Sequence, residues 1–406
     1  MEKRLKITEP DYFSGFKCIG GKCEDSCCIG WDIDIDEVTY NTYLKETDKE
    51  FKDLFSKNMY KNKECMNEYV DYGKIKLKSD KRCPFLNDCN YCRIHSDLGE
   101  ENLSNTCSHF PRVLNKVDDE YEISLDLACP EAARIILNKK DGIEFCRNDI
   151  KLNKYIIAGE IDTCDEEYEG YPIKYFKEIR SFCINIMKER KFSLRERLYI
   201  LGNFIIELED YAEDNCDLVC EFIDNYNIDK QSELYNKNEL NYIMQLSFFE
   251  NIVNSLEIYD ETDSELFKQY TKEALDGFDI KDRNQLESDC DRYIDAFVDY
   301  ERDYIEKNDY VFENYIVNFI YNSLFPYSES DSMFEGYIMM LIRYSLIRFY
   351  LVGRYMNNKT ESADKIIKFI QVFSKAMEHD KNYMEEILDY ITNNGFDDMG
   401  FAEMLI

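Results

Sequence analysis

The chain has 406 residues, of which 44% are hydrophobic and 15% aromatic. This length can bury a sizeable core and usually divides into two domains, and the aromatic content excludes an intrinsically disordered chain. The formal net charge of -33 at pH 7 repels phosphate backbones and anionic lipid surfaces, so we expect no nucleic-acid partner.

Residues 1–10 contain no apolar run of the kind that directs export. We therefore expect a cytoplasmic protein, in which cysteines are kept reduced. Ten of the 16 cysteines nevertheless lie in the first 130 residues. Such clustering of reduced cysteines indicates metal or redox chemistry and not a disulfide framework.

The first cysteine cluster has the spacing Cys18-x4-Cys23-x3-Cys27-Cys28, with glycines on either side. Glycines allow tight turns, which favours a metal-binding loop. Cys27 and Cys28 would point opposite ways in an extended chain, so both reach the same ion only in a turn. Residues 29–35 then alternate apolar and polar side chains, which predicts a half-buried strand.

The second cluster is Cys83-x5-Cys89-x2-Cys92, and Cys107 and Cys129 follow it. Iron-sulfur clusters and zinc both take four sulfur ligands from short loops. Thiolates from the two cysteine clusters can therefore converge on one soft metal centre.

Residues 121–127 alternate like a second strand and run into Cys129, with Pro130 placed as the first residue of a helix. A thiolate at that helix start would be favoured by the helix dipole. His95 and His109 could complete a zinc site or act as a base. We expect them instead to be hydrogen-bonded structural residues.

The second half of the chain is predicted to be helical, since Pro326 is its only proline after residue 172. Apolar residues recur at spacings of three and four in segments 194–211, 239–256, 289–306 and 336–352. From this periodicity we expect roughly eight to ten helices. Residues 337–353 are the most apolar stretch but are too short and too charged to span a membrane, so we expect a buried core helix and no membrane insertion.

These patterns together predict a mainly α protein. A small cysteine-rich α+β metal-binding module is expected at residues 1–150, followed by an all-helical domain at residues 151–406. The sequence contains no GxGxxG, Walker or GxSxG motif, so a Rossmann-type site for a nucleotide or methyl donor is not expected.

In its cysteine segments the chain resembles the flagellin lysine N-methylase family, whose cysteine-rich domain recurs in proteins proposed to chelate zinc or iron. The resemblance extends beyond the cysteines and covers most of the chain. The matching segments are residues 16–23, 27–31, 83–86, 92–94, 103–107, 110–112, 129–134 and 313–326.

The resemblance implies a protein-lysine N-methyltransferase that transfers a methyl group from S-adenosylmethionine to lysine side chains of flagellin. It also implies a [4Fe-4S] cluster, with zinc as the alternative metal. Carried over position by position, the family cysteines fall on Cys18, Cys23, Cys27, Cys28, Cys83, Cys92, Cys107 and Cys129.

The mechanism and the catalytic residues stay open. The CxxxCC spacing differs from the CxxxCxxC loop of radical enzymes that use the same methyl donor, and a helical domain is not their barrel. Two non-enzymatic alternatives also remain. One is a zinc- or iron-chelating module for storage, sensing or assembly, and the other is a zinc-structured adaptor whose acidic helical domain binds a basic partner.

Overall fold

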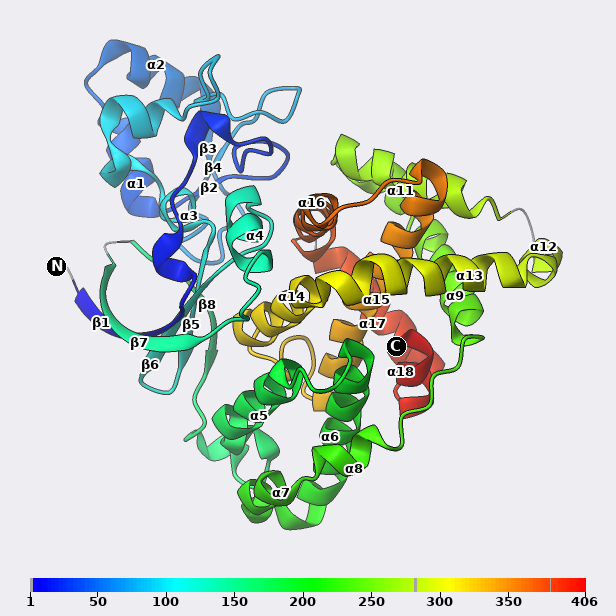
Figure 1. The fold of residues 1–406 in the computed structure, drawn as a ribbon. Helices are drawn as coiled ribbons and strands as arrows, with labels where there is room; N and C mark the ends of the chain where they lie inside the picture. The colour runs from blue at the N-terminus through cyan, green and yellow to red at the C-terminus, as the bar shows by residue number, and fades with distance from the viewer. Residues whose placement is uncertain (1–2, 153, 281–282, 380) are drawn as a thin grey trace. The chain divides into compact units, whose positions relative to one another are not determined.

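The computed structural model describes residues 3–152, 154–280, 283–379 and 381–406. The chain divides into two compact units, which we name the cysteine-rich unit (Met1–Ile135 and Glu144–Glu160) and the helical unit (Ile136–Ile143 and Ile161–Ile406). Figure 1 draws the first mainly in blue and cyan and the second mainly in green to red. We expected one division at residue 150, whereas the chain enters the helical unit within helix α4, leaves it again and returns near residue 161.

The larger sheet of the cysteine-rich unit has five strands in the order β7-β1-β6-β5-β8. β1 runs parallel to β6 and antiparallel to β7, and β5 and β6 form a hairpin. β6 confirms the strand predicted near residues 121–127, although Glu122 and Ser124, expected on an exposed face, are buried as well. The strands are β1 (Lys3–Pro10), β5 (Arg112–Val117), β6 (Glu120–Leu125), β7 (Phe145–Leu152) and β8 (Ile157–Ile161).

The smaller sheet is antiparallel, with β4 (Gly73–Ile75) between β2 (Asp34–Ile35) and β3 (Met59–Lys61). The strand predicted over residues 29–35 is therefore shorter than expected. Gly30 has φ +95°, which interrupts the extended run before β2. Asp36 ends it, because its side chain accepts a 2.9 Å hydrogen bond from the Thr39 amide and caps the next helix.

Among the described residues, four α-helices begin in the cysteine-rich unit. α4 begins at Pro130, as predicted. The α-helices are α1 (Glu37–Leu44), α2 (Lys49–Asn58), α3 (Asn105–His109) and α4 (Pro130–Leu137). Short helical turns are η1 (Phe13–Gly15), η2 (Gly20–Lys22), η3 (Ile94–Leu98) and η4 (Glu100–Asn102).

The helical unit contains fourteen α-helices among the described residues, more than the sequence predicted, because several are only one or two turns long. All four segments predicted to be helical are helical. The α-helices are α5 (Phe176–Lys188), α6 (Leu194–Asn215), α7 (Val219–Asn225), α8 (Ile228–Ser232), α9 (Asn241–Ser255), α10 (Ile258–Glu261), α11 (Glu265–Phe278), α12 (Arg283–Ser288), α13 (Cys290–Tyr300), α14 (Asp309–Asn322), α15 (Met333–Asn358), α16 (Ala363–Phe373), α17 (Lys381–Asn394) and α18 (Met399–Leu405). Short turns are η5 (Glu166–Tyr168), η6 (Pro172–Tyr175), η7 (Cys216–Leu218), η8 (Glu301–Ile305), η9 (Glu306–Asn308) and η10 (Ser374–Glu378).

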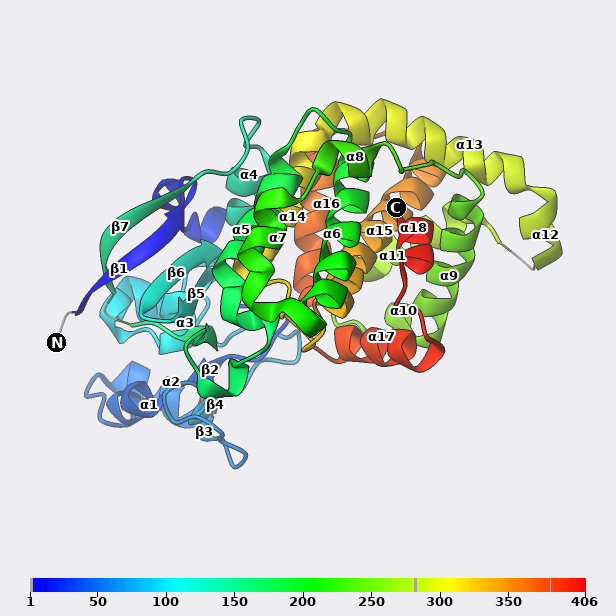
Figure 2. The same cartoon turned by 90° about the horizontal axis from the view of Figure 1, so that it is seen from below.

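α15 forms the core of the helical unit and packs along α11 and α6 (Figure 2). Its residues 333–353 are buried, apart from the partly buried Glu335, which confirms the predicted core helix. Arg343 on this helix pairs with Glu329, while Arg348 donates 2.7 Å hydrogen bonds to the carbonyls of Leu405 and Ile406. No helix in the described ranges is both long and apolar enough to cross a membrane.

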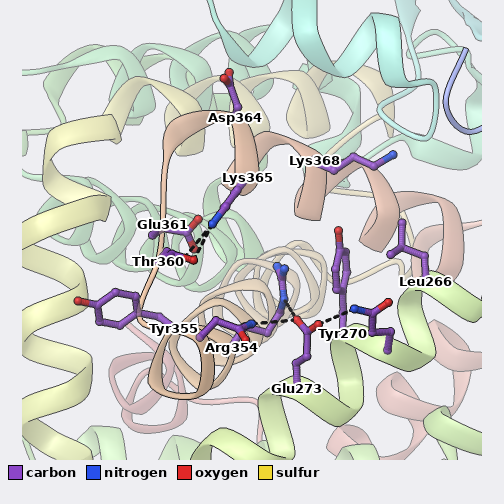
Figure 3. A pocket seen from close by; sticks show the side chains of 12 residues that line it. Leu266, Tyr270, Glu273, Arg354, Tyr355, Thr360, Glu361, Asp364, Lys365 and Lys368 are labelled. Carbon is purple, nitrogen blue, oxygen red and sulfur yellow. Dashed lines mark hydrogen bonds and ion pairs between the residues drawn. The ribbon is translucent and has the colours of Figure 1, made fainter. Parts of the chain in front are cut away.

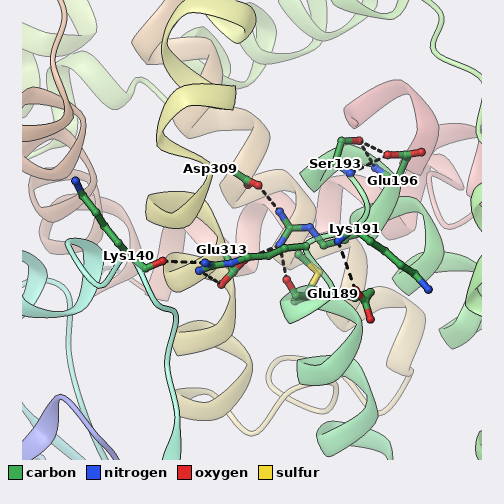
Figure 4. A network of polar contacts seen from close by, with 10 residues as sticks. Lys140, Glu189, Lys191, Ser193, Glu196, Asp309 and Glu313 are labelled. Carbon is green, nitrogen blue, oxygen red and sulfur yellow. Dashed lines mark hydrogen bonds and ion pairs between the residues drawn. The ribbon is translucent and has the colours of Figure 1, made fainter.

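A buried network of ions holds residues 136–143 in the helical unit (Figure 4). Glu313 of α14 accepts hydrogen bonds from Arg190 at 2.8 and 2.9 Å and from Arg197 at 2.7 Å. Arg190 also donates to the Lys140 carbonyl at 2.8 Å. The amide side chain of Asn314 donates to the Lys139 carbonyl at the same distance. Glu313 and Asn314, the first two residues of segment 313–326, therefore both help to hold residues 136–143 in the helical unit.

Candidate metal centre

Four of the eight predicted cysteines share one hydrophobic core in the cysteine-rich unit. We call Cys28, Cys83, Cys92 and Cys107 the inner group. Cys83 is a buried member of that core and the other three pack against it, beside residues such as Ile33, Phe55 and Phe85. The chain is held there locally, since the Cys83 amide donates to the Cys28 carbonyl at 2.9 Å and Cys92 forms a β-bridge with Leu86.

The inner thiols influence one another electrostatically. Burial raises the pKa of Cys107 to about 12, and the neighbouring thiols of Cys28 and Cys92 contribute to this rise. Burial also raises the pKa of Cys83, with contributions from all three other thiols of the group. These effects fit the packing of all four cysteines in one core, because charges influence one another more strongly when they are near.

Hydrogen-bond donors already point at these sulfurs. The Phe85 amide donates to Cys83, and the amides of Ile94 and His95 donate to Cys92. Each bond favours the thiolate and opposes the effect of burial on the pKa. Hydrogen bonds to sulfur also tune metal-bound thiolates, so the donor set fits a soft metal or an iron-sulfur cluster.

The other four predicted cysteines are more accessible. We call Cys18, Cys23, Cys27 and Cys129 the outer group; Cys18 and Cys27 are exposed, and the other two are half-buried. Burial raises the pKa of Cys129 to about 11, with smaller contributions from Cys23 and Cys18. The first amides of α4 donate to the Cys129 sulfur and lower its pKa, as its predicted place at a helix start requires.

One contact ties the outer cysteines to one another, and a second joins their loop to the second cysteine loop. Glu24, next to Cys23, forms a 2.5 Å ion pair with Arg134 on α4, the helix that follows Cys129. Gly21 lies against the second cysteine loop so closely that a Cβ would be 2.4 Å from the Cys89 carbonyl. A side chain at this position would separate the two loops.

Cys27 lies between the two groups. Residues 26–29 form a turn, in which the Ile29 amide donates to the Ser26 carbonyl at 3.1 Å. A hydrogen bond with Cys28 raises the pKa of Cys27 well above its usual value, and burial, Cys107 and Cys18 add to the shift. The turn that the sequence required for adjacent cysteines to meet is therefore present.

The sulfur atoms of the predicted cysteines do not form a tight cluster. Across the described part of the chain, no three of the eight predicted sulfurs lie within 4.8 Å of one another. Four sulfurs around one zinc ion, at a Zn–S distance of about 2.3 Å, would lie about 3.8 Å apart. No three of the described thiols are therefore as close together as they would be around one zinc ion.

One residue outside the eight predicted ligands, His109, differs from its predicted role. Neither ring nitrogen of the buried His109 has a hydrogen-bond partner among the described residues, so the hydrogen-bonded role predicted for it is wrong. Burial and the nearby Arg112 lower its pKa to about 4, so the imidazole is neutral near pH 7.

The sequence did not predict the cavity of about 530 Å³ in the helical unit, which Figure 3 shows between α11, the end of α15 and α16. Arg354 lies 3.7 Å from the ring centroid of Tyr270 and pairs with Glu273 at 3.1 Å. At the other side, the Tyr300 hydroxyl donates to Glu361 at 2.8 Å. Burial raises the pKa of Glu361.

The cavity presents charges of both signs beside aromatic rings. Its acidic residues are Glu273, Glu361 and Asp364, its basic residues are Arg354, Lys365 and Lys368, and its tyrosines are Tyr270 and Tyr355. Its volume is within the usual range for small-molecule sites. This lining suits a zwitterionic ligand that also carries an aromatic group.

Comparison with known proteins shows to which family the chain is related. The family model of the FliB lysine N-methylase C-terminal domain matches residues 180–405, more than half of the chain. The chain is 31% identical over 212 residues to a lysine-N-methylase of Salmonella typhimurium, which covers 52% of this chain and 49% of that protein. It is 37% identical over 142 residues to the flagellar biosynthetic protein FliU of Salmonella muenchen, covering 35% of this chain and 82% of that protein. The chain thus spans about half the length of the lysine-N-methylase it matches, and no solved structure matches it.

Proposed function

Because the chain belongs to the FliB lysine N-methylase family, we propose that it methylates lysine side chains of flagellin with S-adenosylmethionine as the donor. The match of residues 180–405 to a lysine N-methylase domain carries this proposal. The name of the relative FliU supports a flagellar substrate. The net charge of -33 would attract a lysine-bearing surface. We place the reaction in the cytoplasm, where free thiols stay reduced.

The reaction sets a requirement for the site. A bond forms between the lysine nitrogen and the methyl carbon while the bond from that carbon to the sulfonium sulfur breaks, and S-adenosylhomocysteine leaves. The amine attacks only when neutral, whereas the pKa of free lysine is about 10.4. The site must therefore desolvate the amine or accept its proton.

We assign the donor to the cavity of the helical unit. S-adenosylmethionine carries an ammonium, a carboxylate and an adenine ring. The acidic side chains of the cavity can bind the ammonium, Arg354 can bind the carboxylate, and a tyrosine ring can stack on the adenine. Glu361, whose pKa is raised by burial, is our candidate to accept a proton there.

We further propose that the cysteine-rich unit holds a [4Fe-4S] cluster. The shared core of the four inner thiols and the amides directed at the sulfurs of Cys83, Cys92 and Cys129 support this assignment. Such a cluster supplies a redox-active centre and braces the loops that bind it.

The experiment uses protein purified without oxygen, with purified flagellin and S-adenosylmethionine. Mass spectrometry should find methyl groups on flagellin lysines, and calorimetry should detect donor binding. If neither methylation nor donor binding occurs, the methylase proposal is wrong.

A second function is supported by the thiols alone, namely a zinc- or iron-chelating module without enzymatic activity. It predicts stoichiometric metal together with no affinity for S-adenosylmethionine. Zinc without iron or acid-labile sulfide would favour a structural or adaptor role over the cluster.

A further inference from the structure

We propose that the eight cysteines build two separate metal centres, the inner one held by Cys28, Cys83, Cys92 and Cys107 and the outer one by Cys18, Cys23, Cys27 and Cys129. This inference rests on the metal dependence included in the proposed function, but not on methyl transfer. It goes beyond the single cluster that the family resemblance implies. A thiolate centre for zinc or a cubane cluster takes four cysteines, so eight cysteines suffice for two.

The inner group is an independent structural unit. All four cysteines contact one hydrophobic core, which also contains residues of β2, α2 and β4. They come from residues 28–107, the part of the chain that builds this core. The sulfurs of the inner group therefore have fixed places without help from α4.

The outer group depends on a different contact. It joins the loop of residues 18–27 to the start of α4, and none of its four cysteines packs in the inner core. The Glu24–Arg134 ion pair ties that loop to α4, and the Gly20 amide donates to the Cys18 sulfur at 3.4 Å. The inner core and this loop-to-helix contact are thus two separate bases for placing thiols.

Cys27 is a neighbour of both groups. It precedes Cys28 in the turn of residues 26–29, and thiols of both groups, namely Cys28, Cys107 and Cys18, influence it. We assign it to the outer centre, because the inner group already has four thiols in its core. Adjacent cysteines in a turn can each serve a different centre, and the two centres are then neighbours.

The two proposed centres differ in how deeply their cysteines are buried, and this difference gives them different roles. The inner centre, with Cys83 inside the core, would be closed and would brace the fold. The outer centre, with Cys18 exposed, would be open to solvent, so small molecules and chelators could reach its metal. The two centres should therefore lose metal at different rates.

The test compares the full-length protein with Cys23→Ser, Cys92→Ser and the double variant, all purified without oxygen. Iron, zinc and acid-labile sulfide are measured per chain, so that a zinc centre beside a cluster also counts as two. Cys146→Ser is the matched control, since Cys146 is exposed on β7 of the same unit and belongs to neither group. Far-UV circular dichroism checks that each variant is folded.

Two centres predict that each single variant loses one centre and that the double variant loses both, while the control keeps both. A chelator should empty the wild-type protein in two phases, and the fast phase should be missing in Cys23→Ser. This variant keeps the test decisive even if Cys92→Ser does not fold, because Cys23 lies outside the core.

Three results would overturn the inference. Cys23→Ser could lose all metal, or it could keep the full wild-type content. The wild-type protein could also hold a single centre after reconstitution. A protein without any bound metal would refute the metal centres as well, whereas methylation of flagellin would still decide the enzymatic proposal separately.

Discussion

Glu313 is 1% exposed, yet it carries a charge that Arg190 and Arg197 neutralise. Arg197 is completely buried and also pairs with Asp309 at 2.5 Å. Burying ions is tolerated only when each is paired and hydrogen-bonded. Segment 313–326, which the sequence offers only as a resemblance, therefore begins with a residue that holds the fold.

Replacing this carboxylate should destabilise the helical unit. We expect Glu313→Gln to lower the free energy of unfolding by about 3 kcal/mol, because the buried Arg197 loses one of its two carboxylate partners and Arg190 loses its own. Urea unfolding followed by circular dichroism measures the change. Glu306→Gln, at an exposed position just before the same helix, should stay within about 0.5 kcal/mol of the wild type. Equal effects of the two substitutions would show that the buried network contributes little.

The cysteines show how far reasoning at the residue scale extends. Their clustering and the glycines beside them predicted a metal-binding region, and the family resemblance supplied the eight candidate ligands. The division into inner and outer groups was not predictable, because sequence spacing does not tell which loops share a core. Cys28 and Cys107 are the clearest example, since 78 intervening residues separate two thiols that affect each other's pKa.

At the scale of the elements, the contact between α11 and α15 depends on glycine. A Cβ on Gly277 would lie 1.8 Å from the Gly353 carbonyl oxygen. The two backbones approach directly there, which brings Tyr270 of α11 beside Arg354 of α15 in the cavity. A close helix contact thus positions the cavity lining.

A methyl group at this contact should be costly. We expect Gly277→Ala to destabilise the protein by about 2–3 kcal/mol, since the clash exceeds the helix-propensity gain of about 1 kcal/mol. Thermal unfolding measures the effect. Asp276→Ala, on the exposed side of the same helix, is the control and should change stability little. A stable Gly277→Ala variant would mean that the helices can separate without loss.

The proposed donor site gives a second prediction for these helices. We expect Tyr270→Ala to weaken S-adenosylmethionine binding at least about tenfold, because it removes a ring available to stack on the adenine and the support of Arg354. Calorimetry measures the affinity. Tyr171→Ala is the matched control, since this tyrosine is 63% exposed and does not line the cavity. Unchanged affinity in Tyr270→Ala would place the donor elsewhere.

At the scale of the whole molecule, metal removal should affect the two units differently. The proposed ligands all belong to the cysteine-rich unit, whereas the described helices α5 to α18 belong to the helical unit. We expect the metal-free protein to keep most of its helical circular dichroism signal while the thermal transition of the cysteine-rich unit moves to lower temperature. Calorimetry of the loaded and stripped protein tests this. A single transition that is unaffected by stripping would contradict it.

Local patterns by themselves determined the mainly α fold, the core helix at residues 337–353, the helix start at Pro130 and the clustering of cysteines in the first 130 residues. Each of these follows from periodicity, from proline geometry or from clustering, which are properties of neighbouring residues. The tertiary structure alone decided the return of residues 136–143 to the helical unit, the partners of Glu313, the cavity beside Arg354 and the division of the thiols. Those features depend on contacts between distant segments, and such contacts are set by packing and not by any local repeat.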